Sequence, residues 1–404
     1  MQVKKSTISF CIFCVLFLLS IFTGANLTIF NYEAEVVALL SFFVFFEGIF
    51  AGRIFYRRSF TLLEFLFLFQ VVFLGWQCLG NSTFVDKTTI FFIRHVMMLP
   101  LMFVAMKTEY IERLIAVCTK YIILIDLVYL AMWFVRGNNG SFINSYQYVA
   151  AYSSILVVFI FAKFFVSEAF DRKDTIIMIL GLLTLIMTGK RSYIIILCVI
   201  FAIGVLFFKN RHKNQRMLKV VFPIVIIGGI AIGVVPELMN SFARFNELSG
   251  DATLSGRTKL WELANSIWQG NYWTGMGYGT FSTYISENLQ YVYSNFGVQR
   301  TYATHNIYLQ LLSETGIVGT IIFVSFFVFE LVFCLKVLKK AYLLDVESSK
   351  YICTVALFLQ IWFLLYGLSG NPLYMPGQFG LYLFAIMFTC SVRNELRTYD
   401  QYEL

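Results

Sequence analysis

The amino-acid sequence predicts an all-α protein that crosses a membrane many times. Its 404 residues are 59% hydrophobic and only 13% charged, whereas soluble globular domains contain about 25% charged residues. Apolar runs recur along the chain, and a run of about 17–25 residues is long enough to cross a bilayer as a helix. We count about twelve such spans, and a large polar segment interrupts them after the ninth.

The predicted spans follow one another with short connections. They cover residues 7–24, 34–52, 60–79, 89–106, 113–135, 147–167, 174–188, 192–208, 218–235, 316–335, 351–368 and 376–391. The sequence therefore divides into three regions: residues 1–235 with spans one to nine, a loop of residues 236–315, and residues 316–404 with the last three spans and a tail.

The distribution of Lys and Arg predicts the orientation. With the N-terminus in the cytoplasm, the inner segments hold twenty of these residues and the outer segments eight. Basic residues favour the cytoplasmic side, so both termini are predicted inside and the loop 236–315 outside. Joining the spans on either side of Lys190 and Arg191 would destroy this bias. The net charge of +8 is therefore interpreted as a topology signal rather than as a nucleic-acid surface.

The outer face keeps few cations, and two of them are Lys190 and Arg191 between two apolar helices. Charge at membrane depth is costly and often marks a functional cavity. The alternative is a tight turn whose cations reach lipid headgroups.

The outer loop contains a predicted amphipathic helix from Thr258 to Gly270. Its apolar residues are spaced to share one face: Leu260, Trp261, Ala264, Ile267 and Trp268. The two tryptophans favour a helix at the membrane interface. Arg257 is expected in its first turn, and Gly270 is expected to end it.

A glycine-rich run follows at Gly275-Met276-Gly277-Tyr278-Gly279. No strand precedes it, so a dinucleotide-binding fold is not expected. We interpret the run as a bend that lets the backbone approach a ligand or another helix.

A second amphipathic helix is predicted after Thr304, with Thr304 as its N-cap and a break at Thr315-Gly316. His305 then lies in the first turn, where the partial positive charge of the helix lowers the pKa of the imidazole. A neutral His can accept a proton as a general base, and the same helix end can bind phosphate. A His that only caps the loop is the alternative.

Lys190, Arg191, Arg257 and His305 all fall on the predicted outer face. Arg is well suited to hold phosphate oxygens. Cations with a neutral His are what transfer from a diphosphate leaving group requires, because the cations stabilise the departing charge and the His takes the proton of the attacking hydroxyl. No acidic cluster in the outer segments suits a divalent metal, so neither a metal nor another cofactor is expected.

At these residues the sequence resembles the O-antigen ligase and polymerase superfamily of bacterial envelopes. The resemblance covers about 65 residues of the loop and the Thr188–Ser192 turn, and it rests on their order. The matching features are Arg191, Arg257 with Trp261, the bend Gly275–Gly279, His305-Asn306, and Glu314 with Gly316 and Gly319. Family members often carry a Pro before the bend, where this chain has Trp273-Thr274.

The resemblance implies an integral membrane glycosyltransferase of GT-C-like fold that works without metal in the cytoplasmic membrane of a bacterium. Its donor would be a glycan on undecaprenyl diphosphate, with Arg191 and Arg257 at the phosphates and His305 essential. Lys190 is expected to assist the phosphates, and Asn306, Glu314, Gly275 and Gly277 to support the site. We expect Glu314 to be a structural partner rather than a base.

Several functions remain open at this point. The first is a polymerase of lipid-linked repeat units for a capsular polysaccharide or exopolysaccharide, working with a flippase and a chain-length regulator. The second is a ligase that moves a finished glycan to another acceptor. A transporter of lipid-linked glycans would need paired halves or interrupted helices, which the sequence does not indicate, and a scaffold is the remaining alternative. Arg94, His95 and Asp126 have no role assigned.

Overall fold

The computed structural model describes residues 33–50, 62–80, 82–104, 106–136, 146–208, 213–222, 229, 251–298 and 303–402. Within these ranges the chain is helical and forms no β-strand, which confirms the predicted all-α class. The predicted span 7–24 and most of the span 218–235 lie outside the described residues.

Most helices of the first region overlap the predicted spans. Their bounds are α2 (Glu33–Phe50), α3 (Leu62–Cys78), α4 (Val85–Met98), the 3₁₀ helix η1 (Leu99–Phe103), α5 (Thr108–Arg136), α6 (Tyr146–Val166), α7 (Arg172–Met187), α8 (Arg191–Phe207), α9 (Lys213–Arg216) and the π-helical η2 (Met217–Val221). The break between α7 and α8 lies where the charge distribution required it.

The helices of the loop and the last region follow. They are α12 (Asp251–Gly270), α13 (Phe281–Glu287), α14 (Leu289–Phe296), α15 (Ile307–Leu343), α16 (Glu347–Tyr366), the 3₁₀ helix η4 (Pro372–Tyr374) and α17 (Pro376–Tyr402). α12 begins seven residues before the predicted Thr258 and ends at Gly270 as predicted.

Among the described residues, four helical segments are long and apolar enough to cross a membrane: Thr108–Trp133, Tyr148–Val166, Ile307–Leu343 and Glu347–Tyr366. Phe65–Cys78 and Arg191–Phe207 are apolar but shorter. These helices make the chain an integral membrane protein. Twelve spans and a GT-C-like arrangement remain predictions.

Two helices differ from the prediction for clear reasons. The span predicted at 89–106 changes at residue 99 from an α-helix to the buried 3₁₀ turn η1, because Pro100 lacks the N–H that would continue the α-helical ladder. α15 joins the predicted amphipathic segment to the tenth span. It is interrupted at the predicted point, since Gly316 has φ 62° and ψ −167°, a backbone conformation that favours glycine.

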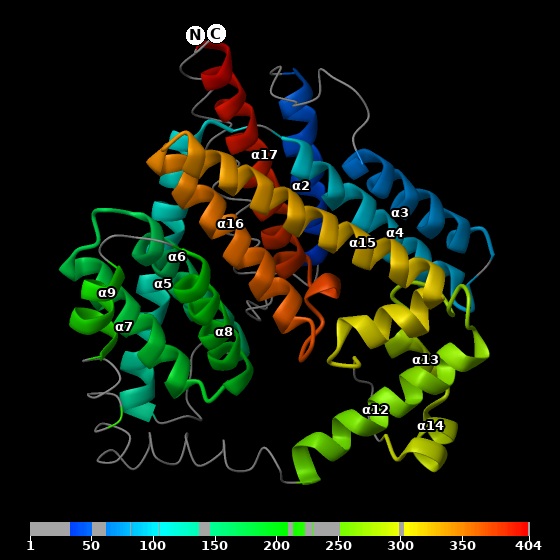
Figure 1. Cartoon of the computed structure of the whole chain (residues 1–404). Helices are drawn as coiled ribbons and strands as arrows, with labels where there is room; N and C mark the ends of the chain where they lie inside the picture. The colour runs from blue at the N-terminus through cyan, green and yellow to red at the C-terminus, as the bar shows by residue number, and fades with distance from the viewer. Residues whose placement is uncertain are drawn as a thin grey trace.

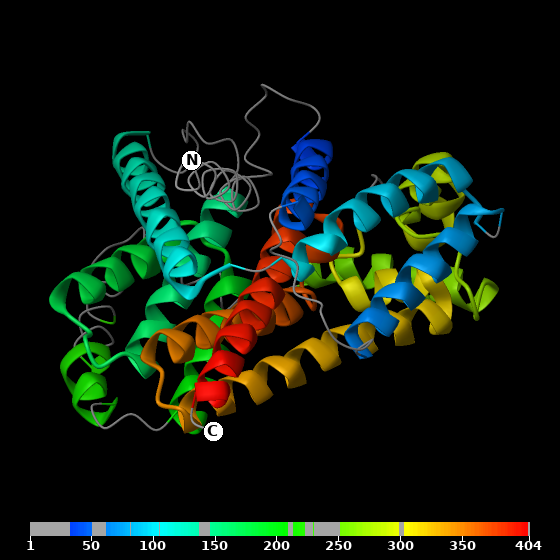
Figure 2. The ribbon, with the colours of Figure 1, turned by 90° about the horizontal axis from the view of Figure 1, so that it is seen from above.

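The main core is built around α16, which packs against α6, α8, α15 and α17 (Figure 1). Trp362 of α16 is 1% exposed, and its indole N–H donates to the Ser154 hydroxyl of α6 over 2.9 Å. Figure 2 shows α17 between the group α5–α9 on one side and the group α3, α4 and α12–α14 on the other.

The described residues 251–298 of the loop have a small core of their own. Leu260, Leu263, Ala264 and Ile267 of α12 pack with Phe281, Ile285 and Val292 of α13 and α14. The apolar face of α12 predicted from its periodicity is therefore present. The side chains of α13 and α14 cover the Leu260, Ala264 and Ile267 part of this face, whereas Trp261 and Trp268 stay half-buried. The position of the helix at the membrane interface remains a prediction.

Candidate functional site

The turn between α7 and α8 presents two cations at a helix start. Gly189 has φ 67°, Lys190 occupies the N-cap position, and Arg191 is the first residue of α8. Cations at a helix N-terminus are opposed by the partial positive charge of the helix. This arrangement is electrostatically costly, and a bound anion would offset the cost.

Arg257 lies in the second turn of α12 and is half-buried. The prediction that it occupies the first turn is wrong, because the helix begins at Asp251. One turn further on, the Trp261 indole N–H donates to the Thr304 carbonyl over 3.0 Å. This hydrogen bond ties α12 to the segment that carries His305.

His305 precedes α15 rather than lying in its first turn. Asn306 is the N-cap, since its side-chain oxygen accepts from Tyr308 N at 3.0 Å and Leu309 N at 3.2 Å. The prediction of Thr304 as the N-cap is therefore wrong by two residues. The Thr304 hydroxyl instead accepts from Asn306 N at 3.2 Å and shapes the turn. His305 itself has φ 55°, a conformation that is uncommon for residues other than glycine.

Three residues predicted for the site, Lys190, Arg257 and His305, interact electrostatically. The pKa of His305 is lowered by burial, then by the charge of Arg257, then by that of Lys190. The pKa of Lys190 is lowered by burial and by Arg257. The lowered pKa expected for His305 is therefore present, and its causes are burial and the neighbouring cations. Arg257 also interacts electrostatically with Tyr366 at the end of α16.

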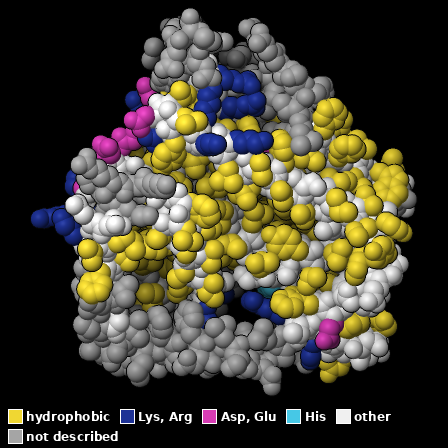
Figure 3. Space-filling model, in the orientation of Figure 1, with side chains coloured by type: hydrophobic (Ala, Val, Ile, Leu, Met, Phe, Trp, Pro, Cys, Tyr) yellow, Lys and Arg dark blue, Asp and Glu magenta, His cyan; other side chains and the backbone are white. Residues whose placement is uncertain are grey.

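The space-filling view has a hollow in this region, below the end of α16, where basic side chains and a histidine are visible (Figure 3). Basic groups around a neutral imidazole are suited to bind an anion and to accept a proton. Arg191 directly follows Lys190 in the chain, at the same helix start.

Glu314 does not belong to this group of charges but to the network that supports it. Its carboxylate is fully buried and accepts from Gly279 N at 2.7 Å, Phe281 N at 2.9 Å, Gln310 Nε2 at 3.0 Å and the Tyr374 hydroxyl at 2.6 Å. A buried carboxylate is stable only when such donors satisfy it.

The network continues from Glu314 to the turn of His305. Gln310 Oε1 accepts from Asn371 Nδ2 at 2.6 Å and from the Thr304 hydroxyl at 3.3 Å. Ile307 N, at the start of α15, donates to the Gly367 carbonyl at 2.8 Å. Local sequence signals could not have found Asn371 and Tyr374, because their partners are distant in the chain. Gln310 lies one helical turn before Glu314.

The glycine-rich bend approaches another helix, one of the two predicted alternatives. Met276 N donates to the Ser313 carbonyl at 3.1 Å, and Gly277 N donates to the Glu314 carbonyl at 2.8 Å. These carbonyls are at the end of the first segment of α15, where helical partners are missing. Gly275 and Gly277 have φ 68° and 123°, and added Cβ atoms would collide with the Glu314 main chain and the Ser82 hydroxyl.

Arg94, His95 and Asp126 take part in packing. His95 is 4% exposed and stacks on Phe379, with 5.0 Å between the ring centres. Asp126 accepts from the Ser153 hydroxyl at 2.8 Å, and the Arg94 guanidinium lies 5.4 Å from the centre of the Phe91 ring.

Residues 176–324 match the family model described as O-antigen ligase. The matched part contains the α7–α8 turn, α12, the glycine-rich bend and His305. The match confirms the resemblance of the chain to the O-antigen ligase and polymerase superfamily, which implies a transferase of lipid-linked glycans. No curated protein matches the chain.

The Glu314 network generates a stability prediction. Glu314→Ala should lower the free energy of unfolding by roughly 3 kcal/mol or more, because several buried donors lose their acceptor at about 1–3 kcal/mol each. Glu314→Gln should cost less, since the amide oxygen still accepts. Thermal unfolding in detergent measures both.

The control for this prediction is Glu287→Gln, because Glu287 is exposed at the end of α13. It should change the free energy of unfolding by less than about 0.5 kcal/mol. Equal stability of Glu314→Ala and the wild type would contradict the network described above.

Proposed function

We propose that the chain is a membrane glycosyltransferase that joins lipid-linked oligosaccharide repeat units into a polysaccharide. The observation that carries this proposal is the half-buried imidazole of His305, whose pKa is lowered by burial, by Arg257 and by Lys190. The site thus combines a neutral proton acceptor with cations that can hold a diphosphate. The family match supports the wider reaction class.

The proposed reaction is an inverting displacement at the anomeric carbon of the donor sugar. The acceptor hydroxyl oxygen forms the new bond to this carbon, and its proton passes to the imidazole of His305. The bond between the anomeric carbon and the diphosphate oxygen breaks, and its electron pair leaves with the diphosphate. Arg191, Arg257 and Lys190 hold the leaving group and stabilise its developing charge.

The donor proposed is a glycan on undecaprenyl diphosphate, and the acceptor is another glycan. The site would lie on the outer face of the bacterial cytoplasmic membrane, with both termini in the cytoplasm, as the Lys and Arg distribution predicts. The loop 236–315 would then form the extracytoplasmic catalytic region between the two groups of spans. A flippase would supply the donor, and a chain-length regulator would act on the product.

The site residues generate the first functional prediction. His305→Ala, Arg257→Ala and Arg191→Ala should each abolish polymer without lowering protein abundance, because a proton acceptor or a phosphate ligand is lost. Polymer is measured by gel and the protein by immunoblot. Lys259→Ala is the matched control, since Lys259 is exposed on the same helix as Arg257. Wild-type polymer in any two of the three variants would remove the proposed site.

The electrostatics generate a pH prediction. The rate should rise with pH as His305 loses its proton, and the midpoint should lie below the ordinary His value of about 6.5. Lys190→Gln removes one of the charges that lower the pKa of His305, so the acidic limb should move to higher pH, and the maximal rate should fall.

The measurement is kcat/KM against pH with a purified lipid-linked donor. The variant Lys259→Gln should keep the wild-type profile. An acidic limb that stays in place or moves to lower pH in Lys190→Gln would contradict a role for His305 as the base.

A deletion strain distinguishes a polymerase from a ligase. Loss of a polymerase should leave single repeat units on the lipid, because flipping continues while joining stops. Loss of a ligase should leave long chains that are still attached to the lipid. Mass spectrometry of the lipid-linked material measures the difference, and long chains would replace the proposed polymerase with the ligase alternative.

A further inference from the structure

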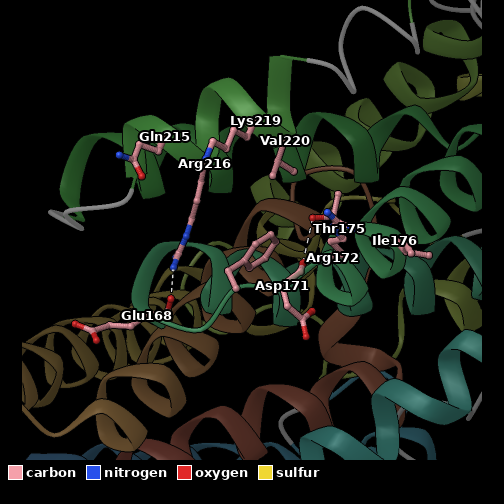
Figure 4. Close-up of a pocket in the computed structure, with 10 residues that line it drawn as sticks. Glu168, Asp171, Arg172, Thr175, Ile176, Gln215, Arg216, Lys219 and Val220 are labelled. Carbon is pink, nitrogen blue, oxygen red and sulfur yellow. Dashed lines mark hydrogen bonds between the residues drawn. The ribbon is translucent and has the colours of Figure 1, made fainter.

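A cavity with basic residues in its lining lies at the opposite end of the helices that carry the candidate site. α7 has 16 residues between Arg172 and Met187, so its ends are about 24 Å apart. The Lys190 turn follows its end, and the cavity surrounds its start (Figure 4). α16 also extends from one region to the other. Its first residue, Glu347, accepts from the Ser167 hydroxyl of the α6–α7 connection at 3.0 Å. Its last residue, Tyr366, interacts with Arg257 of the candidate site.

The cavity has a volume of about 650 Å³, within the range of about 300–1,000 Å³ that is usual for small-molecule sites. It lies between the α6–α7 connection, the first turns of α7, and the segment α9–η2. The residues that line it include Phe170, Arg172, Ile176, Arg216 and Lys219.

Arg216 supplies a fixed positive charge to the wall. It is 8% exposed, and its guanidinium donates to the Phe164 carbonyl at 2.7 Å and the Glu168 carbonyl at 2.8 Å. It also lies 5.5 Å from the centre of the Phe170 ring. Figure 4 shows this side chain reaching from α9 to the α6–α7 connection. Main-chain carbonyls orient the guanidinium, and the carboxylates of Asp174 and Glu168 interact with its charge.

Two acidic residues, Glu168 and Asp171, also line the cavity. Asp171 accepts from Asp174 N at 3.0 Å in a capping box, and Asp174 pairs with Lys163 at 2.8 Å. The Glu168 side chain points away from the other labelled residues in Figure 4. Arg172 and Lys219 are exposed and line the cavity together with Arg216, so three cations against two carboxylates leave the lining with a net positive charge.

Exposed apolar side chains lie beside these cations. Ile176, which lines the cavity, is 64% exposed, and Leu218 and Phe222 of the neighbouring segment are 69% and 59% exposed. A soluble anion needs only the cations, whereas a lipid needs apolar surface next to them. Basic pockets between membrane helices are known to bind anionic lipid headgroups.

We propose that this cavity binds the headgroup of an anionic phospholipid. Arg172 and Lys219 contact the phosphate, the fixed charge of Arg216 adds to the attraction, and the acyl chains lie against Ile176, Leu218 and Phe222. The proposed lipid lies in the membrane leaflet opposite the candidate site. This proposal does not depend on the glycosyl transfer proposed above.

The test is a titration of the full-length chain in detergent with short-chain phosphatidylglycerol or phosphatidylcholine, followed by native mass spectrometry. Phosphatidylglycerol should bind the wild type more tightly than phosphatidylcholine. The double variant Arg172→Gln/Lys219→Gln should weaken phosphatidylglycerol binding about 30-fold, because each basic residue near a membrane surface contributes about fivefold. Both side chains are exposed, and size-exclusion chromatography verifies that the variant stays folded.

The matched control is Lys173→Gln/Lys336→Gln, which loses the same charge from exposed residues that do not line the cavity. It should bind phosphatidylglycerol as the wild type does. Equal loss of phosphatidylglycerol binding in both double variants, or no loss in either, would contradict the proposed lipid site. Equal binding of the two lipids would overturn its preference for anionic lipid, and displacement of phosphatidylglycerol by equimolar inorganic phosphate would show a soluble-anion site instead.

Discussion

The arrangement of the candidate site depends on one buried carboxylate. Glu314 accepts hydrogen bonds from the glycine-rich bend, from α15 and from Tyr374 after α16. A buried carboxyl group and the donors around it cannot lose such partners without a large free-energy cost, so these three segments are held in one geometry. Gln310 and Thr304 extend the connection to the turn of His305. The buried Glu314 therefore helps to hold the turn that carries His305.

The electrostatics of the candidate site indicate that the donor binds before His305 becomes a strong base in the proposed reaction. Before an anion binds, burial and the charges of Arg257 and Lys190 keep the imidazole of His305 neutral. A bound diphosphate would offset their charge, and the pKa of His305 would then rise. The imidazole would become a stronger base only when the donor is in place. The pKa of His305 can respond to the diphosphate in this way only if the cations and the imidazole share one site. A helix dipole alone would not produce this response.

The sequence predicted what depends on local pattern. Hydropathy located the helices, the charge distribution located the break before Arg191, and Gly316 marked the interruption of α15. The N-cap prediction failed because Thr304 and Asn306 are both suitable N-cap residues. Which of the two residues caps α15 depends on the hydrogen bond of Trp261 to Thr304 and on the hydrogen bond of Ile307 to Gly367. The partners of Glu314 could not be predicted, since Tyr374 is 60 residues away. The apolar face of α12 was clear, but periodicity cannot tell whether lipid or protein covers it.

The lengths of α7 and α16 connect the two charged regions of the molecule. α7 begins with a capping box at Asp171 and ends at the turn of Lys190, so its start and its end move together. A contact with lipid headgroups at the start would fix the depth of the helix in the bilayer. The depth of Lys190 at the other end would then follow from the helical rise. A diphosphate on a membrane lipid is held at a defined depth, so the cations that bind it must be held there as well. An anchor on one leaflet can therefore serve a reaction on the other.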